Sequence, residues 1–148
     1  MEKLPPIEKI PEAYSAIADG RIDMSEKYAI VKSSTLEKEY CIKWKENLYY
    51  SNDSSTYWQG YPGYPVLAVL FLQGILSLKK EVIPYFKGIN WNALNKETKR
   101  DYQKSLAIAL EKFDLDTKEM INQEIKRVYE DVKKLDILLT KRKSEVEE

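Results

Sequence analysis

The sequence predicts an α+β fold: a small antiparallel β-meander packed on a buried helix, followed by a helical hairpin with a long last helix. Apolar and polar residues alternate with a period of two from residue 21 to residue 50, which is typical of antiparallel strands with one apolar face. Residues 65–76 are apolar nearly all round, which indicates a helix that is buried on every side. From residue 96 onward, apolar positions recur at helical spacing.

We expect the whole chain, residues 1–148, to form a single domain. A chain of 148 residues that is 43% hydrophobic can bury one core of useful size. Residues 11–78 hold a first short helix, the meander and the buried helix. Residues 79–95 form a connection, and residues 96–148 form the helical hairpin.

The first helix is expected to begin at Pro11 and to end near Gly20. Proline's fixed φ suits the first helical turn, Glu12 complements the helix dipole there, and a glycine terminates a helix readily. Residues 51–64 are rich in loop-forming residues and end in Tyr-Pro-Gly-Tyr, which has the preferences of a type II turn.

The two C-terminal helices have recognisable starts. Asn95 is placed to cap a helix over 96–113, and Asp116 with Glu119 forms the start of a final helix over 117–143. The apolar positions of the final helix are spaced by 4, 3, 4, 3 and 4 residues, the pattern of a coiled-coil seam: Ile121, Ile125, Val128, Val132, Leu135 and Leu139.

This final helix should extend beyond its partner by about nine residues, or roughly 14 Å at the helical rise. Leucines on the overhang would have no partner within the hairpin, and a row of exposed leucines is unfavourable in water. We therefore expect self-association as a homodimer, although the N-terminal arm, the sheet or the 66–76 helix could cover the seam instead. The predicted self-association residues are Val132, Leu135, Leu138 and Leu139.

Six aromatic residues fall between residues 49 and 64. One interpretation is a recognition surface, since tyrosine and tryptophan offer large contact area at low entropic cost. The other is that the loop holds itself in place by packing its rings on the sheet. The candidate partner-binding residues are Tyr57, Trp58, Tyr61 and Tyr64.

The composition excludes several kinds of chemistry. The chain has no histidine and one cysteine, which excludes Ser-His-Asp and Cys-His catalysis, histidine-ligated metals and internal disulfides. Neither of the common glycine-rich nucleotide-binding motifs is present. We expect no catalytic residues, no metal site and no cofactor, and a non-enzymatic protein is favoured over a small enzyme with a tyrosine and carboxylate site.

Nucleic-acid contact is an alternative that the charge distribution leaves open. The 24 basic and 24 acidic residues balance, but residues 79–104 carry a net charge of +4. Stacking of bases on the aromatic loop would need cations beside the rings, and the nearest lysines in the sequence are Lys43 and Lys45. The candidate contacts are Lys79, Lys80, Lys99 and Arg100.

No signal or transit segment begins the chain, and the most apolar run, residues 66–78, is too short to span a bilayer. We therefore expect a cytoplasmic protein that does not enter a membrane. Abundant charged residues, with little glutamine and one cysteine, favour a thermophilic origin.

The order of elements in residues 11–78 resembles that of SWIM-type zinc-finger domains. Those domains have a β-hairpin, a C-x-C pair, a loop, and then a C-x-H pair that enters an apolar helix, and the family is associated with DNA or protein interaction. The segments that carry the resemblance are Ala18–Arg21, Tyr28–Ser33, Lys38–Trp44, Tyr49–Asn52 and Tyr64–Leu70. The ligand positions are held by Tyr50, Asn52, Tyr64 and Val66, so no zinc-binding role is carried over.

These features favour a non-enzymatic interaction or scaffold protein, with itself and another protein as partners. The alternatives are a nucleic-acid-associated factor that uses residues 79–104, and a small enzyme of unknown class.

Overall fold

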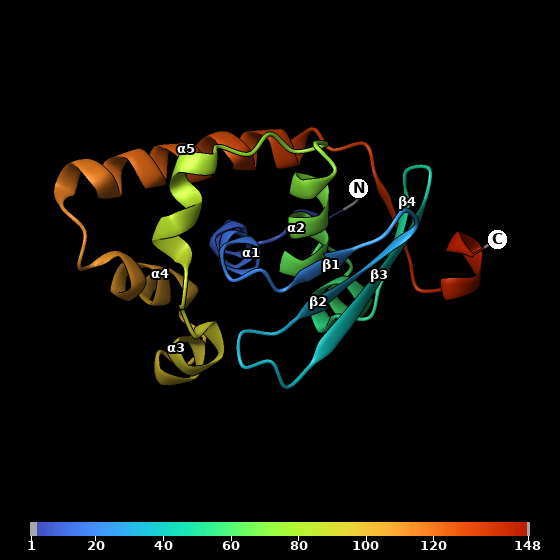
Figure 1. Cartoon of the computed structure of the whole chain (residues 1–148), viewed down its shortest axis with the longest axis horizontal. Helices are drawn as coiled ribbons and strands as arrows, with labels where there is room; N and C mark the ends of the chain where they lie inside the picture. The colour runs from blue at the N-terminus through green and yellow to red at the C-terminus, as the bar shows by residue number, and fades with distance from the viewer. Residues whose placement is uncertain (1–2, 148) are drawn as a thin grey trace.

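The computed structural model describes residues 3–147, which form the α+β fold that the sequence predicts (Figure 1). The α-helices are α1 (Lys9–Ala18), α2 (Tyr64–Leu72), α3 (Trp91–Glu97), α4 (Tyr102–Leu110) and α5 (Leu115–Lys133). The strands are β1 (Ile22–Met24), β2 (Tyr28–Lys32), β3 (Glu39–Lys45), β4 (Leu48–Ser51) and β5 (Leu138–Thr140). Three short helices complete the fold: the π-helical η1 (Ser55–Gln59) and the 3₁₀ helices η2 (Lys80–Phe86) and η3 (Lys143–Val146).

The strands form one sheet in the order β1-β2-β3-β4-β5. The first four are antiparallel neighbours, as expected for a meander, and β5 pairs with β4 in parallel. Ala29 pairs with Ile42 and Trp44 pairs with Tyr49, so the apolar residues of adjacent strands share one face. That face packs against the helices.

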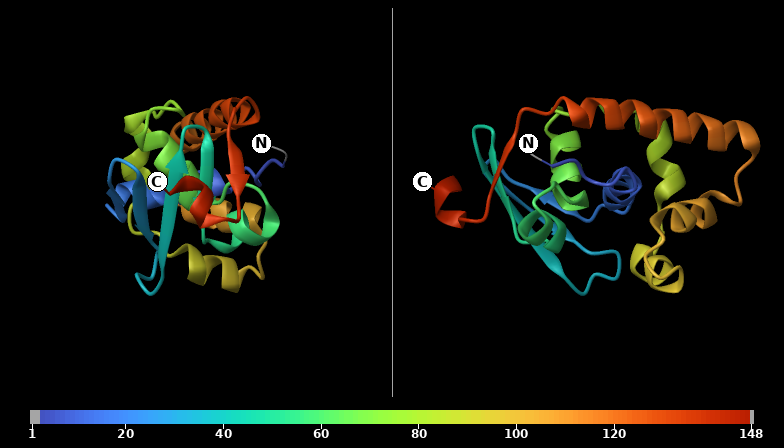
Figure 2. Two further views of the ribbon diagram at one scale, coloured as in Figure 1. Left: turned by 90° about the vertical axis from the view of Figure 1, so that its right-hand side faces the viewer. Right: turned by 180° about the vertical axis from the view of Figure 1, so that it is seen from behind.

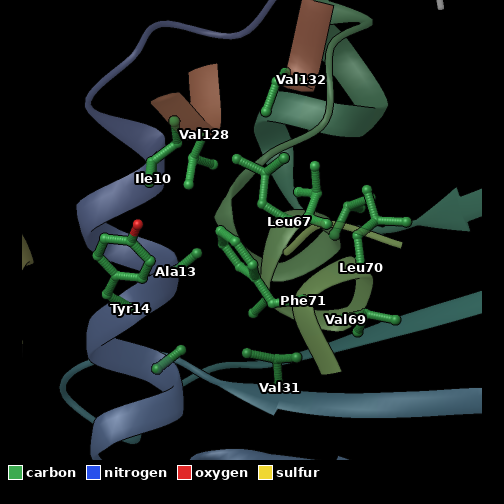
Figure 3. Packing of buried hydrophobic residues seen from close by; sticks show 14 of the residues in the cluster. Ile10, Ala13, Tyr14, Val31, Leu67, Val69, Leu70, Phe71, Val128 and Val132 are labelled. Carbon is green, nitrogen blue, oxygen red and sulfur yellow. The ribbon is translucent and has the colours of Figure 1, made fainter. Parts of the chain in front are cut away.

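Helix α2 is the centre of the helical layer, and Val66 to Leu70 are completely buried in it. It lies between α1 and the sheet, while η3 lies on the other face of the sheet (Figures 1 and 2). The Tyr14 ring from α1 lies 5.5 Å from the Phe71 ring and 5.3 Å from the Phe86 ring, measured between centroids. Figure 3 shows Tyr14 and Phe71 within this cluster, with Val128 and Val132 of α5 above them.

The connection over residues 79–95 is more ordered than the sequence indicates. It contains η2 and the start of α3, and Val82, Phe86 and Trp91 are buried. Ser15 attaches it to α1, because its hydroxyl donates to the Phe86 carbonyl at 2.7 Å and accepts from Trp91 Nε1 at 2.7 Å.

The predicted helix over 96–113 is wrong, since α3 and α4 occupy this region as two helices. Asn90 caps α3 and Asp101 caps α4, each through a side-chain oxygen that accepts a backbone N–H. Between them, Lys99 and Arg100 have φ of 56° and 66°, a left-handed conformation that ends a helix. Asn95 is therefore not a cap.

The predicted continuation of the last helix to residue 143 is also wrong. Helix α5 ends at Lys133, and residues 138–140 form strand β5 instead of a helix. The edge of β4 supplies the reason, because its backbone groups need partners. The Leu138 amide donates to the Asn47 carbonyl at 2.9 Å, and Ile137 is buried beside it. No overhanging coiled-coil seam forms over these residues.

Glu12 is a buried carboxylate on α1. It forms an ion pair with Lys9 at 3.6 Å, and its Oε1 accepts from Asn95 Nδ2 at 3.1 Å. Burial raises the pKa of Glu12 above its usual 4.5, and the opposing effects of Lys9, Asn95 and Arg21 are smaller. The native state therefore binds this proton more tightly than the unfolded state does.

This predicts a pH-dependent effect of Glu12→Gln. The contribution of a group whose pKa is raised on folding is fully present below its unfolded value and is lost as the pH rises through its folded value. Glutamine does not titrate, so the free energy of unfolding of the variant minus that of the wild type should increase as the pH rises above the usual glutamate pKa of 4.5. Urea unfolding across this range measures the difference. A difference that stays constant or decreases would contradict the raised pKa.

Candidate functional site

The segment from Ser51 to Tyr64 is a loop only in part. Its middle forms the π-helix η1, and Gly60 ends this helix at a φ of 76°, a conformation that glycine adopts without strain. The Tyr57 amide donates to the Asp53 carbonyl at 2.9 Å, which fixes the first turn to the residues after β4.

A buried polar network holds this segment in place. Asp53 is 5% exposed, and its carboxylate accepts hydrogen bonds from the Ser51 hydroxyl and from the Thr56 amide at 3.1 Å. Thr56 Oγ1 in turn accepts from the Gly63 amide at 2.9 Å. Gly63 has no room for a side chain, because a Cβ there would collide with the Asp53 carboxylate. The Asp53 carboxylate thus holds the start of η1, and the Thr56 hydroxyl holds Gly63 beyond the end of this helix.

The network presents aromatic rings to solvent. The Trp58 side chain is 71% exposed, and its ring meets that of Tyr57 edge to face at 4.8 Å between centroids. Tyr57 and Tyr61 are half-buried. These three rings lie outside the hydrophobic core cluster of the described residues.

Two lysines lie beside these rings. Lys141 Nζ is 5.6 Å from the centroid of Tyr57 and 5.6 Å from that of Trp58. Lys3 Nζ is 5.4 Å from the Tyr61 centroid and donates to the Gln59 carbonyl at 3.0 Å. All three ring–cation distances are in the cation–π range. We call Tyr57, Trp58 and Tyr61, together with Lys3 and Lys141, the aromatic surface.

The sequence could not place Lys141 here, since it lies at the far end of the chain. Pairing of Tyr50 with Thr140 brings β5 alongside β4, so the residue after β5 emerges next to the segment after β4. Tyr50 adjoins the same region: burial raises its pKa, and the nearby Cys41 and Tyr57 raise it further. Lys43, which lies near Tyr50 and lowers that pKa, forms an ion pair with Glu147 at 3.0 Å.

Tyr64 has a different environment from the other three predicted partner-binding residues. Its ring meets that of Tyr40 edge to face at 6.3 Å, and the Arg21 guanidinium lies 6.0 Å from its centroid. Burial raises the pKa of the Tyr64 hydroxyl, and the opposing effect of Arg21 is smaller. Tyr64 packs against the core, as the packing interpretation of the aromatic segment expects.

The four predicted self-association residues do not share one surface. Val132 is completely buried, and Leu135 and Leu139 are half-buried against the core. Leu138 is 52% exposed and lies in β5, the edge strand of the sheet.

The four predicted nucleic-acid contacts are exposed but lie at two separate places. Lys79 and Lys80 are at the start of η2, whereas Lys99 and Arg100 form the turn between α3 and α4. Figures 1 and 2 show η2 between these two places.

Within residues 3–147, no group of three or more Cys, Asp or Glu side chains lies close enough together to hold a metal ion. Of the positions where SWIM-type domains have zinc ligands, Val66 is buried in the core, and Asn52 Oδ1 accepts from the Cys41 amide at 2.9 Å. The resemblance to SWIM-type domains stays a prediction. In the same part of the chain, no helix combines the length and the apolar character needed to cross a membrane.

Comparison with known proteins identifies a family. The model of the family described as uncharacterised conserved protein UCP014422 matches residues 2–138. The chain belongs to this family. No curated protein and no solved structure matches the chain. The matched region includes η1 and its buried network but ends before Lys141.

Asp53→Ala should destabilise the protein by about 1–3 kcal/mol, because it leaves the buried Ser51 hydroxyl and Thr56 amide without their acceptor. Ser54→Ala is the matched control, since this neighbour is exposed and makes no side-chain capping bond. Urea unfolding of the two variants measures the effect. Equal stabilities would show that the Asp53 network does not hold the loop.

Proposed function

We propose that this protein is a non-enzymatic interaction protein and that the aromatic surface binds its partner. The observation that carries the proposal is the 71% exposure of the Trp58 side chain. An exposed indole gains free energy when a partner covers it, and tryptophan is enriched among the residues that dominate binding energy.

The support beneath Trp58 strengthens the proposal. The Asp53 carboxylate holds the Thr56 amide at the start of η1, and the Thr56 hydroxyl holds the Gly63 amide beyond its end, both through buried hydrogen bonds. A surface that is ordered before binding loses little conformational entropy when the partner arrives. The loop therefore has the properties of a preorganised recognition element.

Trp58→Ala should remove partners that Trp58→Phe retains, because phenylalanine keeps an aromatic ring at the same position. Affinity capture from the native host, with each variant compared with the wild type, measures this. Leu36→Ala is the control, since Leu36 is also an exposed large apolar residue but lies in the turn between β2 and β3. An unchanged set of captured molecules in Trp58→Ala would refute the proposal.

We also propose self-association, now through the edge strand β5 rather than a coiled coil. The supporting observation is Leu138, which is 52% exposed on a strand whose outer edge pairs with no other strand within residues 3–147. The residues that would have formed the seam, such as Val132, are engaged in the core.

Under this proposal the wild type runs as a dimer in gel filtration with light scattering, and Leu138→Glu runs as a monomer of 17.4 kDa. The substitution should leave the fold intact, because the Leu138 side chain faces solvent. A wild type that is already monomeric at high concentration would exclude self-association.

The nucleic-acid alternative through residues 79–104 and the enzyme alternative stay predictions. Two grooves in the described residues, one between α4 and α5 and one beside Arg21, are lined by residues outside the aromatic surface.

A further inference from the structure

We infer that the ligand of the aromatic surface is single-stranded nucleic acid, whose bases stack on Trp58 and Tyr57 and whose phosphates lie at Lys141 and Lys3. This inference rests on the proposed function and names its partner.

The rings provide the stacking part of such a site. Most of the Trp58 indole is open to solvent, and Tyr57 supports it edge to face at 4.8 Å. Unpaired bases offer a planar face that stacks on an aromatic side chain, whereas the bases of a duplex are already stacked on one another. An exposed ring on a rigid support therefore favours a single strand over a duplex.

The lysines provide the electrostatic part. Lys141 lies 5.6 Å from two ring centroids and Lys3 lies 5.4 Å from a third, so a base on these rings would carry its phosphates past both ammonium groups. Stacking sites for single strands combine rings with adjacent cations in this way. The sequence alone does not show this combination, since it places only Lys43 and Lys45 near the aromatic segment.

Two further cations lie in the same terminal segment as Lys141. Arg142 and Lys143 follow Lys141 directly and are exposed. Two glutamates of this terminal segment have partners among the described residues: Glu147 pairs with Lys43 at 3.0 Å, and Glu145 accepts from the Thr140 hydroxyl at 2.9 Å. A chain with zero net charge thus places cations where the rings are exposed.

An acidic peptide is the other ligand that lysines could attract. Its carboxylates would pair with Lys141 and Lys3, but it would leave the open face of Trp58 without a planar partner. The observed combination of rings and cations therefore favours the nucleic acid, and the acidic peptide becomes an outcome of the test.

The test is fluorescence anisotropy with the full chain and labelled 20-nucleotide probes. The probes are oligo-dT, oligo-U and a duplex of the same length, and the salt concentration is varied. The wild type should bind both single strands about tenfold or more tightly than the duplex. Its affinity should fall as salt rises, because bound phosphates release counterions. The oligo-dT and oligo-U arms distinguish DNA from RNA.

Variants identify the site. Trp58→Ala should weaken single-strand binding by about tenfold or more, and Trp58→Phe should retain most of it. Lys141→Gln should reduce the slope of log affinity against log salt by about 0.7, the value for one phosphate contact on a single strand. Lys99→Gln is the matched control, since Lys99 is also exposed but lies in the α3–α4 turn. Thermal unfolding of each variant verifies that it is folded.

Four results would overturn the inference: no salt-dependent binding, equal affinity for the duplex, binding unaffected by Trp58→Ala, or binding weakened by Lys99→Gln instead of Lys141→Gln. If a polyglutamate peptide binds in a Trp58-dependent manner and the oligonucleotides do not, the inference fails while the proposed interaction function stands. If neither probe binds and Trp58→Ala also captures the same molecules as the wild type, both fail.

Discussion

The parallel pairing of β5 with β4 is the interaction on which the C-terminal architecture and the aromatic surface both depend. It gives hydrogen-bond partners to an otherwise open sheet edge, and its register aligns Tyr50 with Thr140. It accompanies the end of α5 at Lys133 and the burial of Ile137. It also delivers Lys141 to the rings of Tyr57 and Trp58. A single short strand thus joins the end of the chain to the segment after β4.

Buried hydrogen bonds perform a second task, since they attach connecting segments to the helices and strands beside them. Ser15 connects α1 to the Phe86 carbonyl and to the Trp91 indole, and Asp53 connects Ser51 at the end of β4 to Thr56 at the start of η1. A buried polar group is costly unless it is paired, so each such network stabilises one arrangement of its loop strongly over the alternatives. Short polar side chains therefore act here as specific connectors between elements.

Local patterns were sufficient for much of the fold but not for its boundaries. The alternation of Ala29 and Val31 with exposed neighbours, and the uninterrupted apolar run around Leu67, correctly predicted the meander and the buried helix. The 4-3 spacing correctly indicated that Val128 and Val132 face a partner, but that partner is the core of the same chain. Leu139 continues the same spacing although it lies in a strand. The spacing of apolar residues therefore does not show where a helix ends.

The sequence also predicted the candidate site only in part. Local composition alone identified Tyr57, Trp58 and Tyr61 as candidate partner-binding residues, because six aromatic residues fall within one short segment. It could not show that Trp58 is exposed while Tyr64 packs inward, and it gave no sign that Asp53 anchors the segment.

By itself, the sequence determined the α+β class, the meander and the buried helix. Its lack of histidine and its single cysteine also excluded catalysis by histidine and internal disulfides. Only the tertiary structure decided where α5 ends, which rings face solvent and which cations accompany them. The reason is physical: patterning is a property of neighbours along the chain, whereas the β4–β5 pairing and the ring–cation contacts of the aromatic surface join residues more than fifty positions apart.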